Sequence, residues 1–489
     1  MDSATGRWVV TATVLGSGVA ALGATVVNIG LPAIGRDLDA DLTGLQWVTT
    51  AYVLTLSAFL LLGGALGDRY GRRRIFQIGV VWFAAASVLC AIAPTAGVLI
   101  AARAVQGIGA ALLTPGSLAI LQASFAPADR SKAIGAWSGL GGLATAAGPV
   151  LGGWLVDAAS WRWVFLVNLP MALATVLIAA RQVPESRDEE QAQRGGRLDV
   201  GGAALAVIWL GALALALIGA PERGWTAPAT LVQLAAAGAA FVAFLALERA
   251  VTDPLLPLEV FRETRFSAVN AVTFVVYGAL TGGLFLLPIV LQVGAGYSPL
   301  ESGLATLPIT AIMLVGSAPS GALATRIGPK LQLSVGPALV GLGLFLLRGA
   351  GDGAYVTTVL PGLIVQGIGL AVTVAPLTAV ALDAAPPEHA GVASAVNNNV
   401  ARAAGLIAVA VLPGVVGLDA GAFTSGEGLS AGYRMAMDLS ALGCLAGGVL
   451  AALTIDNRLA ATPDVPDYHC AVEGPPPSRP ARVEAAGAR

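Results

Sequence analysis

The most informative segment of this sequence is residues 64–74, which read Gly64-Ala65-Leu66-Gly67-Asp68-Arg69-Tyr70-Gly71-Arg72-Arg73-Arg74. It follows a long apolar run, and its glycines allow helices to approach each other closely. The Asp68 carboxylate can accept hydrogen bonds from a neighbouring helix N-terminus or pair with an arginine. A positively charged cytoplasmic turn would explain the arginines alone. It leaves Asp68 and the glycines unexplained, so the pattern favours a contact that forms and breaks.

The composition places the chain in lipid. Of its 489 residues, 56% are hydrophobic and 11% are charged, whereas soluble domains average about 25% charged residues. The 62 glycines fit membrane helices, where glycine is frequent. A formal net charge of −2 offers no basic surface for nucleic acid. The cysteines and histidines lack metal-ligand spacing, so we expect no metal and no cofactor.

Apolar runs long enough to span a bilayer, which takes about 20 residues per helix, recur along the chain. We therefore expect an all-α polytopic membrane protein with fourteen spans. The runs cover approximately residues 8–30, 45–66, 75–94, 97–121, 132–156, 163–182, 200–220, 229–249, 268–292, 302–325, 331–349, 355–382, 390–415 and 433–455.

An internal repeat divides these spans into two lobes. Gln106-Gly107-Ile108-Gly109 recurs as Gln366-Gly367-Ile368-Gly369, with an offset of 366 − 106 = 260. Residues 64–69 recur in degraded form as Gly321-Ala322-Leu323-Ala324-Thr325-Arg326, with an offset of 321 − 64 = 257. Span four thus maps onto span twelve, so two extra spans separate two six-helix lobes. We expect lobes at 1–182 and 266–455, linker segments with the extra spans (200–220 and 229–249) at 183–265, and a disordered tail at 456–489.

Basic residues in the connecting loops set the orientation, because they mark the cytoplasmic side. With the N-terminus inside, fifteen fall in cytoplasmic loops and five in the opposite loops. The fifteen are Arg69, Arg72, Arg73, Arg74, Arg130, Lys132, Arg181, Arg187, Arg194, Arg197, Arg249, Arg262, Arg265, Arg326 and Lys330, and the five are Arg36, Arg162, Arg223, Arg348 and Arg434. We therefore expect a multi-pass protein of the cytoplasmic membrane with both termini in the cytoplasm.

Segment 64–74 resembles the signature loop of the major facilitator superfamily, a Gly-x-Leu-x-Asp-Arg-x-Gly-Arg-Arg pattern. The fourteen spans, Thr25-Val26-Val27-Asn28 with Leu31-Pro32 in helix one, and Trp161-Arg162-Trp163-Val164-Phe165-Leu166-Val167-Asn168-Leu169-Pro170 together resemble the drug:proton antiporters of the EmrB/QacA type. The resemblance covers nearly the whole chain. It implies a secondary transporter that exports lipophilic or cationic small molecules by alternating access and is driven by protons. It also implies a gating loop, formed by Gly64, Asp68, Arg69, Gly71, Arg72 and Arg73.

Two further segments carry the resemblance. Residues 99–109 look like the superfamily's helix-four motif, with Arg103 as its buried arginine. An intramembrane cation marks a functional site unless its side chain snorkels to the interface, and that alternative stays open. Helix five looks like the motif of the antiporter branch, whose small residues let it pack tightly and bend. The residues concerned are Gly139, Gly148, Pro149, Gly152 and Gly153.

Helix one departs from the family pattern at position 23. The pattern has an aspartate two residues before Thr25, where this chain has Gly23. With a rise of about 1.5 Å per residue, Gly23 and Arg103 lie at similar depths in their helices. The absent carboxylate would be level with the arginine, which leaves the usual proton carrier in doubt. An acid introduced at position 23 is expected to be tolerated beside Arg103, since a paired buried charge is less costly than a lone one.

Other polar residues within the spans are candidates for coupling or for the substrate cavity. Arg402 lies near the midplane of its helix and is expected to face the cavity or a polar partner. Asp438 is a coupling candidate, but it lies one turn from Arg434 and the two are expected to pair. Interhelical hydrogen bonding explains the asparagines as well as substrate contact does. The cavity candidates are Thr25, Asn28, Gln106, Asn270, Tyr277, Asn397 and Asn398.

Three functions are compatible with these observations. The leading one is proton-driven export of lipophilic drugs or antibiotics by a monomer whose partners are the bilayer, the substrate and protons. The second is movement of lipids or lipophilic metabolites with weak or atypical proton coupling, which Gly23 motivates. The third is a membrane enzyme in which Asp37, Asp39 and Asp41 bind metal, although a charged connector explains these aspartates. Carboxylates are scarce in the spans, which disfavours uptake of polar nutrients.

Overall fold

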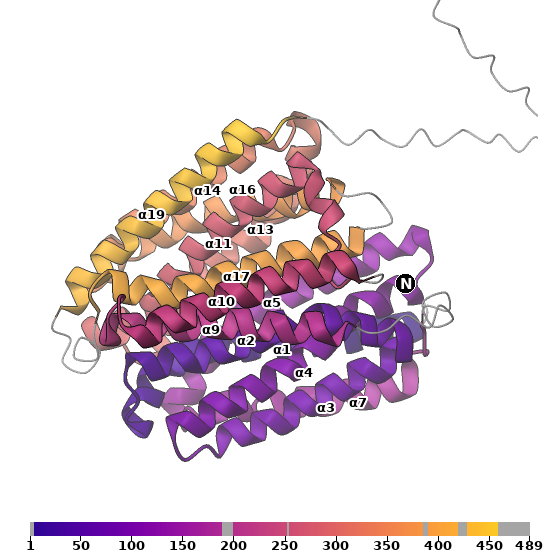
Figure 1. Cartoon of the computed structure of the whole chain (residues 1–489), viewed down its shortest axis with the longest axis horizontal. Coiled ribbons are helices and arrows are strands. Elements are labelled where there is room, and N and C mark those ends of the chain that lie inside the picture. The colour runs from indigo at the N-terminus through magenta and orange to yellow at the C-terminus, as the bar shows by residue number, and fades with distance from the viewer. Residues whose placement is uncertain (1–3, 188–198, 252–253, 385–389, 419–427, 458–489) are drawn as a thin grey trace, which may run out of the picture.

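The computed structural model is a bundle of helices and describes residues 4–187, 199–251, 254–384, 390–418 and 428–457 (Figure 1). The expected tail at 456–489 lies outside these residues except for its first two positions. The elements are α1 (Ala4–Leu38), α2 (Leu42–Tyr70), α3 (Arg72–Ala91), α4 (Ala96–Ser124), α5 (Pro127–Ala158), α6 (Trp163–Leu166), α7 (Asn168–Gln182), α9 (Val200–Arg223), α10 (Pro228–Ala250), η1 (Leu258–Arg262), α11 (Thr264–Ile289), η2 (Val290–Gly294), α12 (Pro299–Ala305), α13 (Leu307–Ile327), α14 (Lys330–Leu346), η3 (Leu347–Gly349), α15 (Tyr355–Thr358), α16 (Leu360–Asp383), α17 (Ala390–Val415) and α19 (Leu429–Thr454).

Within the described residues, fourteen helical segments are long and apolar enough to cross a membrane, which confirms the predicted number. Several of these segments join two elements in one span, such as α6 with α7 (Trp163–Gln182) and α12 with α13 (Pro299–Ile327). The first span extends further than expected, because α1 continues through Pro32 to Leu38.

Helices α1 to α7 form one lobe and α11 to α19 the other, shown in indigo to purple and in rose to yellow in Figure 1. The extra helix α9 packs against α2 of the first lobe and α17 of the second, and α10 packs against α9. An apolar cluster joins the three helices at this seam, since it contains Leu54 of α2, Leu210 of α9 and Leu406 of α17. The extra pair therefore covers one side of the boundary between the lobes.

The internal repeat is visible in the backbone of the two lobes. Gly71 ends α2 with a φ of 109°, and Gly328 ends α13 with a φ of 83°. These glycines are separated by 328 − 71 = 257 residues, the offset of the degraded sequence match. Residues with side chains rarely adopt such φ values, so glycine is required at both turns.

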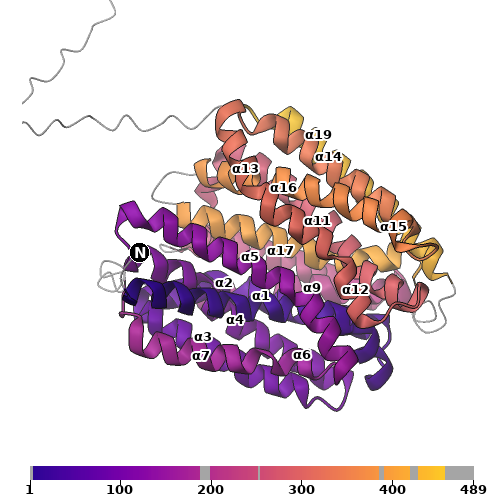
Figure 2. The same cartoon turned by 180° about the vertical axis from the view of Figure 1, so that it is seen from behind.

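The two lobes meet closely where α5 crosses α12, away from the N-terminus (Figure 2). A Cβ atom at Gly153 would overlap the Pro299 carbonyl oxygen, and one at Gly303 would overlap the Pro149 carbonyl oxygen. Glycine on both helices therefore allows direct contact between the two backbones. We call this end of the bundle the α5–α12 end and the other the Gly71 end.

Polar contacts also join the lobes at the α5–α12 end. The Leu300 backbone N–H donates to the Asp157 carboxylate at 2.9 Å. The Gln292 side-chain amide donates to the carbonyl oxygen of Ile29 at 3.0 Å. The α5–α12 end is therefore closed by hydrogen bonds as well as by packing.

Candidate functional site

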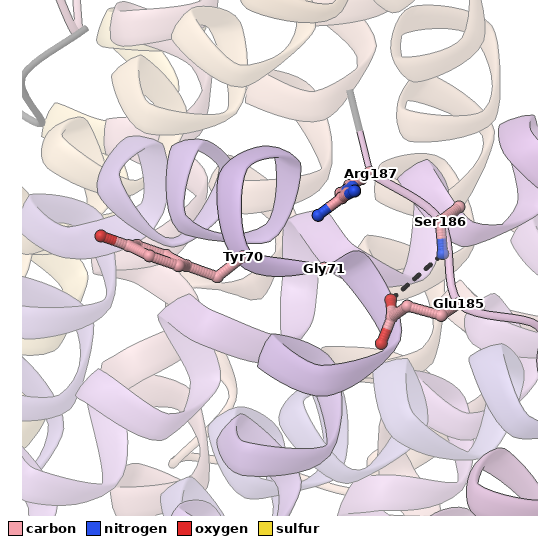
Figure 3. Close-up of a pocket in the computed structure, with 5 residues that line it drawn as sticks. All are labelled: Tyr70, Gly71, Glu185, Ser186 and Arg187. Carbon is pink, nitrogen blue, oxygen red and sulfur yellow. Dashed lines mark hydrogen bonds between the residues drawn. The ribbon is translucent and has the colours of Figure 1, made fainter. Parts of the chain in front are cut away.

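The turn at Gly71 lies beside the segment that follows the last helix of its lobe, which includes Glu185, Ser186 and Arg187 (Figure 3). The backbone N–H of Arg73 donates to Glu185 Oε1 at 3.0 Å, and Arg73 Nη1 donates to the Val183 carbonyl oxygen at 3.0 Å. The Arg72 N–H donates to the Ser186 carbonyl oxygen at 2.8 Å. A Cβ atom at Gly71 would lie 2.8 Å from the Glu185 carboxyl carbon, so a larger residue would disturb this contact.

Asp68 pairs with an arginine of its own loop. Arg72 Nε donates to Asp68 Oδ1 at 2.7 Å, one helical turn away in sequence. This is one of the two partners expected from the sequence. Two other residues of the expected gating loop have neighbours nearby. The guanidinium carbon of Arg69 lies 5.5 Å from the centroid of the Tyr70 ring. A Cβ atom at Gly64 would lie 3.7 Å from Pro115 Cβ of α4.

The second lobe has a matching arrangement. The Lys330 backbone N–H donates to the Asn457 side-chain oxygen at 3.1 Å. Arg265 and Asp383 form an ion pair at 2.9 Å near the same end of the bundle. In both lobes, the segment after the last helix thus accepts hydrogen bonds from the turn between the second and third helices.

Arg103 is buried, with 1% of its surface exposed, so its side chain does not snorkel to the interface. Its Nε donates to the Val48 carbonyl oxygen at 3.1 Å, and its Nη1 donates to Gly23 O at 3.1 Å and to Gln106 Oε1 at 2.5 Å. Its guanidinium carbon lies 4.2 Å from the centroid of the Tyr52 ring, within range for a cation–π interaction. Neutral oxygens and one aromatic face therefore hold this cation, and no described carboxylate forms an ion pair with it.

Gln106 extends this network into α3. Its amide nitrogen donates to Ser87 Oγ at 2.7 Å, and Ser87 in turn donates to the Phe83 carbonyl oxygen at 2.8 Å. Gln106 itself is fully buried. The structure therefore places this cavity candidate beside Arg103, where it orients the guanidinium.

Gly23 lies level with Arg103, as expected from the helix depths, but its missing side chain points elsewhere. A Cβ atom at position 23 would lie 2.5 Å from Phe83 Cζ. Phe83 has none of its surface exposed. The aromatic ring therefore occupies the space that a side chain at position 23 would need.

The asparagines of the second lobe hydrogen-bond to each other between helices. Asn397 Nδ2 of α17 donates to Asn270 Oδ1 at 3.1 Å and to Thr273 Oγ1 at 2.9 Å, both on α11. Asn270 donates to the Phe266 carbonyl oxygen at 2.9 Å. This geometry favours the structural explanation for Asn270 and Asn397. Asn398 is exposed.

The expected pairing of Asp438 with Arg434 is wrong. Asp438 Oδ1 lies 3.7 Å from Arg348 Nη1, whereas Arg434 Nη1 lies 4.0 Å from Asp352 Oδ2. The side chain of Asp438 is 43% exposed. Asp438 and Arg434 of α19 therefore each pair with a residue near the end of α14, where the two segments lie side by side.

Arg402 is partly buried in the middle of α17, and its Nε is shielded from solvent without a hydrogen-bond partner. The remaining cavity candidates are less distinctive. Thr25 Oγ1 donates to Ala21 O of its own helix at 3.0 Å. Asn28 and Tyr277 are partly buried.

These features belong to a known family of membrane proteins. The family model described as Major Facilitator Superfamily matches residues 13–410. The chain belongs to this superfamily. Its fold is similar to the solved structure of a bacterial homologue of the human lysosomal transporter Spinster, at a TM-score of 0.65 and 15% identity, covering 93% of this chain and 98% of that chain.

Several bacterial facilitators are similar in sequence over most of this chain. The multidrug resistance protein Stp of Mycobacterium tuberculosis (strain CDC 1551 / Oshkosh) is 37% identical, covering 83% of this chain and 75% of that protein. The tetracenomycin C resistance and export protein of Streptomyces glaucescens is 36% identical, covering 82% and 74% respectively. The puromycin resistance protein of Streptomyces alboniger is 36% identical, covering 90% and 89%. The chain is therefore a membrane transporter and not an enzyme.

The glycines of α5 in this transporter fall into two groups. Cβ atoms at Gly148 and Gly152 would overlap or crowd Thr25 and Val26 of α1, while Gly153 faces α12. A Cβ atom at Gly139 would have no neighbour within 4 Å. The expected tight packing is therefore confined to the half of α5 near α12, which also contains Pro149.

Two of the three aspartates weighed for an enzyme, Asp37 and Asp41, have structural partners. Asp37 Oδ2 accepts from Arg162 Nη1 at 2.6 Å and from Trp161 Nε1 at 2.9 Å. Asp41 caps α2 by accepting from the Gly44 N–H at 2.7 Å. Among the described residues, no group of three or more His, Cys, Asp or Glu side chains could hold a metal ion.

Several residues at these contacts were not predicted from the sequence. Glu185, Asn457 and Asp157 lie in short segments near helix ends, where polar residues are ordinary. Phe83 is one of many apolar residues in α3.

Proposed function

We propose that this facilitator exports lipophilic small molecules, including antibiotics, across the cytoplasmic membrane by alternating access. Its relatives bear names of multidrug, tetracenomycin C and puromycin resistance. The observation that carries the mechanism is the asymmetry between the two ends of the bundle. Inter-lobe contacts between Gly153 and Pro299, and between Asp157 and Leu300, close the α5–α12 end.

The Gly71 end supports the same mechanism. There the Asp68–Arg72 and Arg73–Glu185 contacts stay within the first lobe, and the Arg265–Asp383 ion pair stays within the second. Gly135 and Gly139, in the half of α5 near this end, have nothing within 4 Å of a Cβ atom. Among the residues that the structure describes, one end is closed by inter-lobe contacts and the other shows no such contact, which is the arrangement that alternating access requires.

We infer from the excess of basic residues that the Gly71 end lies in the cytoplasm, together with both termini. In that orientation the described conformation is closed to the outside. Asp68, Gly71 and Arg72 then form a cytoplasmic gate whose ion pair within the loop exchanges for a contact with the second lobe when this end closes.

We propose that transport is only weakly coupled to proton movement through helix one. Arg103 is held by the neutral oxygens of Gly23, Val48 and Gln106, so no acid is needed to retain its charge. Asp438, the other coupling candidate, pairs with Arg348 and is partly exposed. We propose that the transporter acts as a monomer, since the path lies between lobes of one chain.

Accumulation assays test the proposed function. Cells lacking their own major pumps would express this chain and be exposed to a panel of dyes and antibiotics, including tetracenomycin C and puromycin. We expect cells with the parent chain to accumulate less of at least one compound. Cells with an equal amount of folded Asp68→Asn should accumulate as much of it as cells without the chain. Equal accumulation with and without the chain for every compound contradicts export.

A further inference from the structure

Arg402 is a cation in the middle of α17 that forms no ion pair with any residue the structure describes. Its side chain is partly buried, and its Nε is shielded from solvent without a hydrogen bond. None of the ion pairs among the described residues includes it. A partly buried guanidinium with an unfilled hydrogen-bond donor favours an anion that can accept from it.

The position of Arg402 directs it toward the first lobe. Residues 398, 402 and 409 share one face of α17, because they are spaced by four and seven positions. Val409 lies in the apolar cluster that also contains Val27 and Val48 of the first lobe. Its carbonyl oxygen accepts from Gln46 Nε2 of α2 at 2.6 Å. Arg402 therefore faces the boundary between the lobes and not the lipid.

Tyr52 connects this arginine to the buried network of the first lobe. The Tyr52 ring stacks on Arg103, and it also interacts electrostatically with Arg402. Its hydroxyl donates to the Ala20 carbonyl oxygen at 3.1 Å, so it is not an anion that would balance either charge. Two guanidinium groups, one from each lobe, thus lie within electrostatic range of one aromatic side chain.

Acidic residues do not compensate for these charges. In the described spans, the carboxylates lie near helix ends, and the most interior is Asp438, which is partly exposed and paired with Arg348. One turn before Arg402, the Asn399 side-chain oxygen is also shielded without a partner. The boundary between the lobes therefore carries positive charge and unfilled hydrogen-bonding capacity.

We propose that Arg402 binds the anionic group of the transported molecule, so that this exporter prefers lipophilic anions to lipophilic cations. The inference rests on the proposed function and names its substrate class. An anion with an apolar body pairs with the guanidinium while its body contacts the apolar boundary. A cation meets like charge there and finds no acid to pair with.

A matched set of probes tests this preference directly. 1-Pyrenebutyrate, 1-pyrenebutanol and 1-pyrenebutylamine share one apolar body and differ in charge. Binding to purified transporter in phosphatidylcholine nanodiscs is measured by quenching of tryptophan fluorescence, with empty nanodiscs subtracted. We expect the butyrate to bind at least about tenfold more tightly than the amine, a modest effect for a charge pair shielded from water.

Variants assign the preference to Arg402. Arg402→Gln should remove it without lowering the unfolding temperature, because the side chain has no partner to lose, and Arg402→Lys should retain part of it. Arg434→Gln is the matched control, since this exposed arginine lies at the end of the second lobe, and it should leave the preference unchanged. Equal affinities for the three probes, or a preference that survives in Arg402→Gln, would overturn the proposal.

A lipid headgroup is the other source of the same anionic chemistry. Nanodiscs with equal amounts of phosphatidylcholine and phosphatidylglycerol distinguish the two. A butyrate preference maintained in the mixed nanodiscs supports a site for the transported molecule, whereas its loss there assigns Arg402 to lipid headgroups and contradicts the proposal. The accumulation assays test the proposed function independently of this inference. Export of neutral or cationic compounds without a preference for anions would support export and refute the anion preference.

Discussion

Arg103 Nη1 donates a hydrogen bond to the carbonyl oxygen of Gly23 across 3.1 Å, joining α4 to α1 through backbone and not through a carboxylate. The donor is a permanent cation with 1% of its surface exposed. Oxygens of Val48 and Gln106 complete its shell. The guanidinium is therefore satisfied in a way that does not depend on the protonation of an acid.

Replacing Gly23 by aspartate tests whether helix one can acquire proton coupling. Because a Cβ atom there would lie 2.5 Å from Phe83 Cζ, we expect Gly23→Asp alone to reduce folded protein. The double variant Gly23→Asp with Phe83→Leu makes room and should increase the dependence of transport on an imposed pH gradient in proteoliposomes. Gly23→Ala with Phe83→Leu is the control without charge. An equal pH-gradient dependence in the two double variants would refute this role for position 23.

The Gly71 turn provides a test of the contact with Glu185. Gly71→Ala places a side chain at a φ of 109°, which costs about 1–3 kcal/mol, and adds a close approach to Glu185. Gly224→Ala is a matched control, because Gly224 has a φ of 98° and nothing within 4 Å of a Cβ atom. Both variants should unfold at lower temperature than the parent in detergent. Gly71→Ala should in addition lose turnover per folded molecule, and equal turnover in the two variants argues against a gate.

Gly153 tests the closure between α5 and α12. A Cβ atom there would overlap the Pro299 carbonyl oxygen, so Gly153→Ala should shift the population toward opening of the α5–α12 end. Spin labels at Ala158 and Ala295, in a chain without its native cysteines, should report longer distances in this variant. Gly142→Ala, with nothing within 4 Å of its Cβ, should leave them unchanged. Identical distance distributions would show that this contact does not set the conformation.

Two buried carboxylates at the extra helices give a stability prediction. Asp199 and Glu248 are 7% and 3% exposed, and each has an oxygen without a hydrogen-bond partner. A Cβ atom at Gly202 would be close to both carboxylates, 2.7 Å from Glu248 Oε1, so the two side chains meet there. Arg249 is adjacent in sequence but forms no ion pair with them, as is true of every basic residue in the described ranges.

Two carboxylates that meet away from water without a cation favour one proton shared between them. We expect Glu248→Gln to stabilise the folded protein by about 1 kcal/mol, because its amide can donate to Asp199 without such a proton. The stability difference between Glu248→Gln and the parent should grow as the pH rises. The parent then loses the proton between its two carboxylates, whose negative charges repel each other. Unfolding temperatures at several pH values measure this, with Glu259→Gln on the exposed η1 segment as the control. A parent and a Glu248→Gln variant with parallel pH profiles would contradict the shared proton.

The fold could be predicted from the sequence because apolar runs of spanning length and an internal repeat both indicate it. Apolar length identifies each span, and the offsets between Gln106 and Gln366 and between Gly64 and Gly321 identify the lobes. The same reasoning placed Gly23 and Arg103 at one depth, since the helical rise is constant. It also named an arginine and a helix N-terminus as alternative partners for Asp68, and the structure places Arg72 at this carboxylate.

The sequence could not predict the contacts that depend on side-chain direction. Asp438 and Arg434 are one turn apart and were expected to pair, but Arg348 lies closer to Asp438 and Asp352 lies closer to Arg434. Gly139 resembles Gly153 in sequence context, yet only Gly153 faces a neighbouring backbone. Phe83 fills the space beside Gly23 because α3 packs there, and no local pattern encodes that approach.

The most direct test of the central claim measures the direction of transport in inverted membrane vesicles. The vesicles contain the parent chain or Asp68→Asn in equal amounts, and the compound used is the one that the parent most strongly excludes from cells. Because the Gly71 end then faces outward, we predict that parent vesicles accumulate the compound and that Asp68→Asn vesicles accumulate much less. Accumulation that is equal in the two, or that occurs only in right-side-out vesicles, would contradict export through a gate at the Gly71 end.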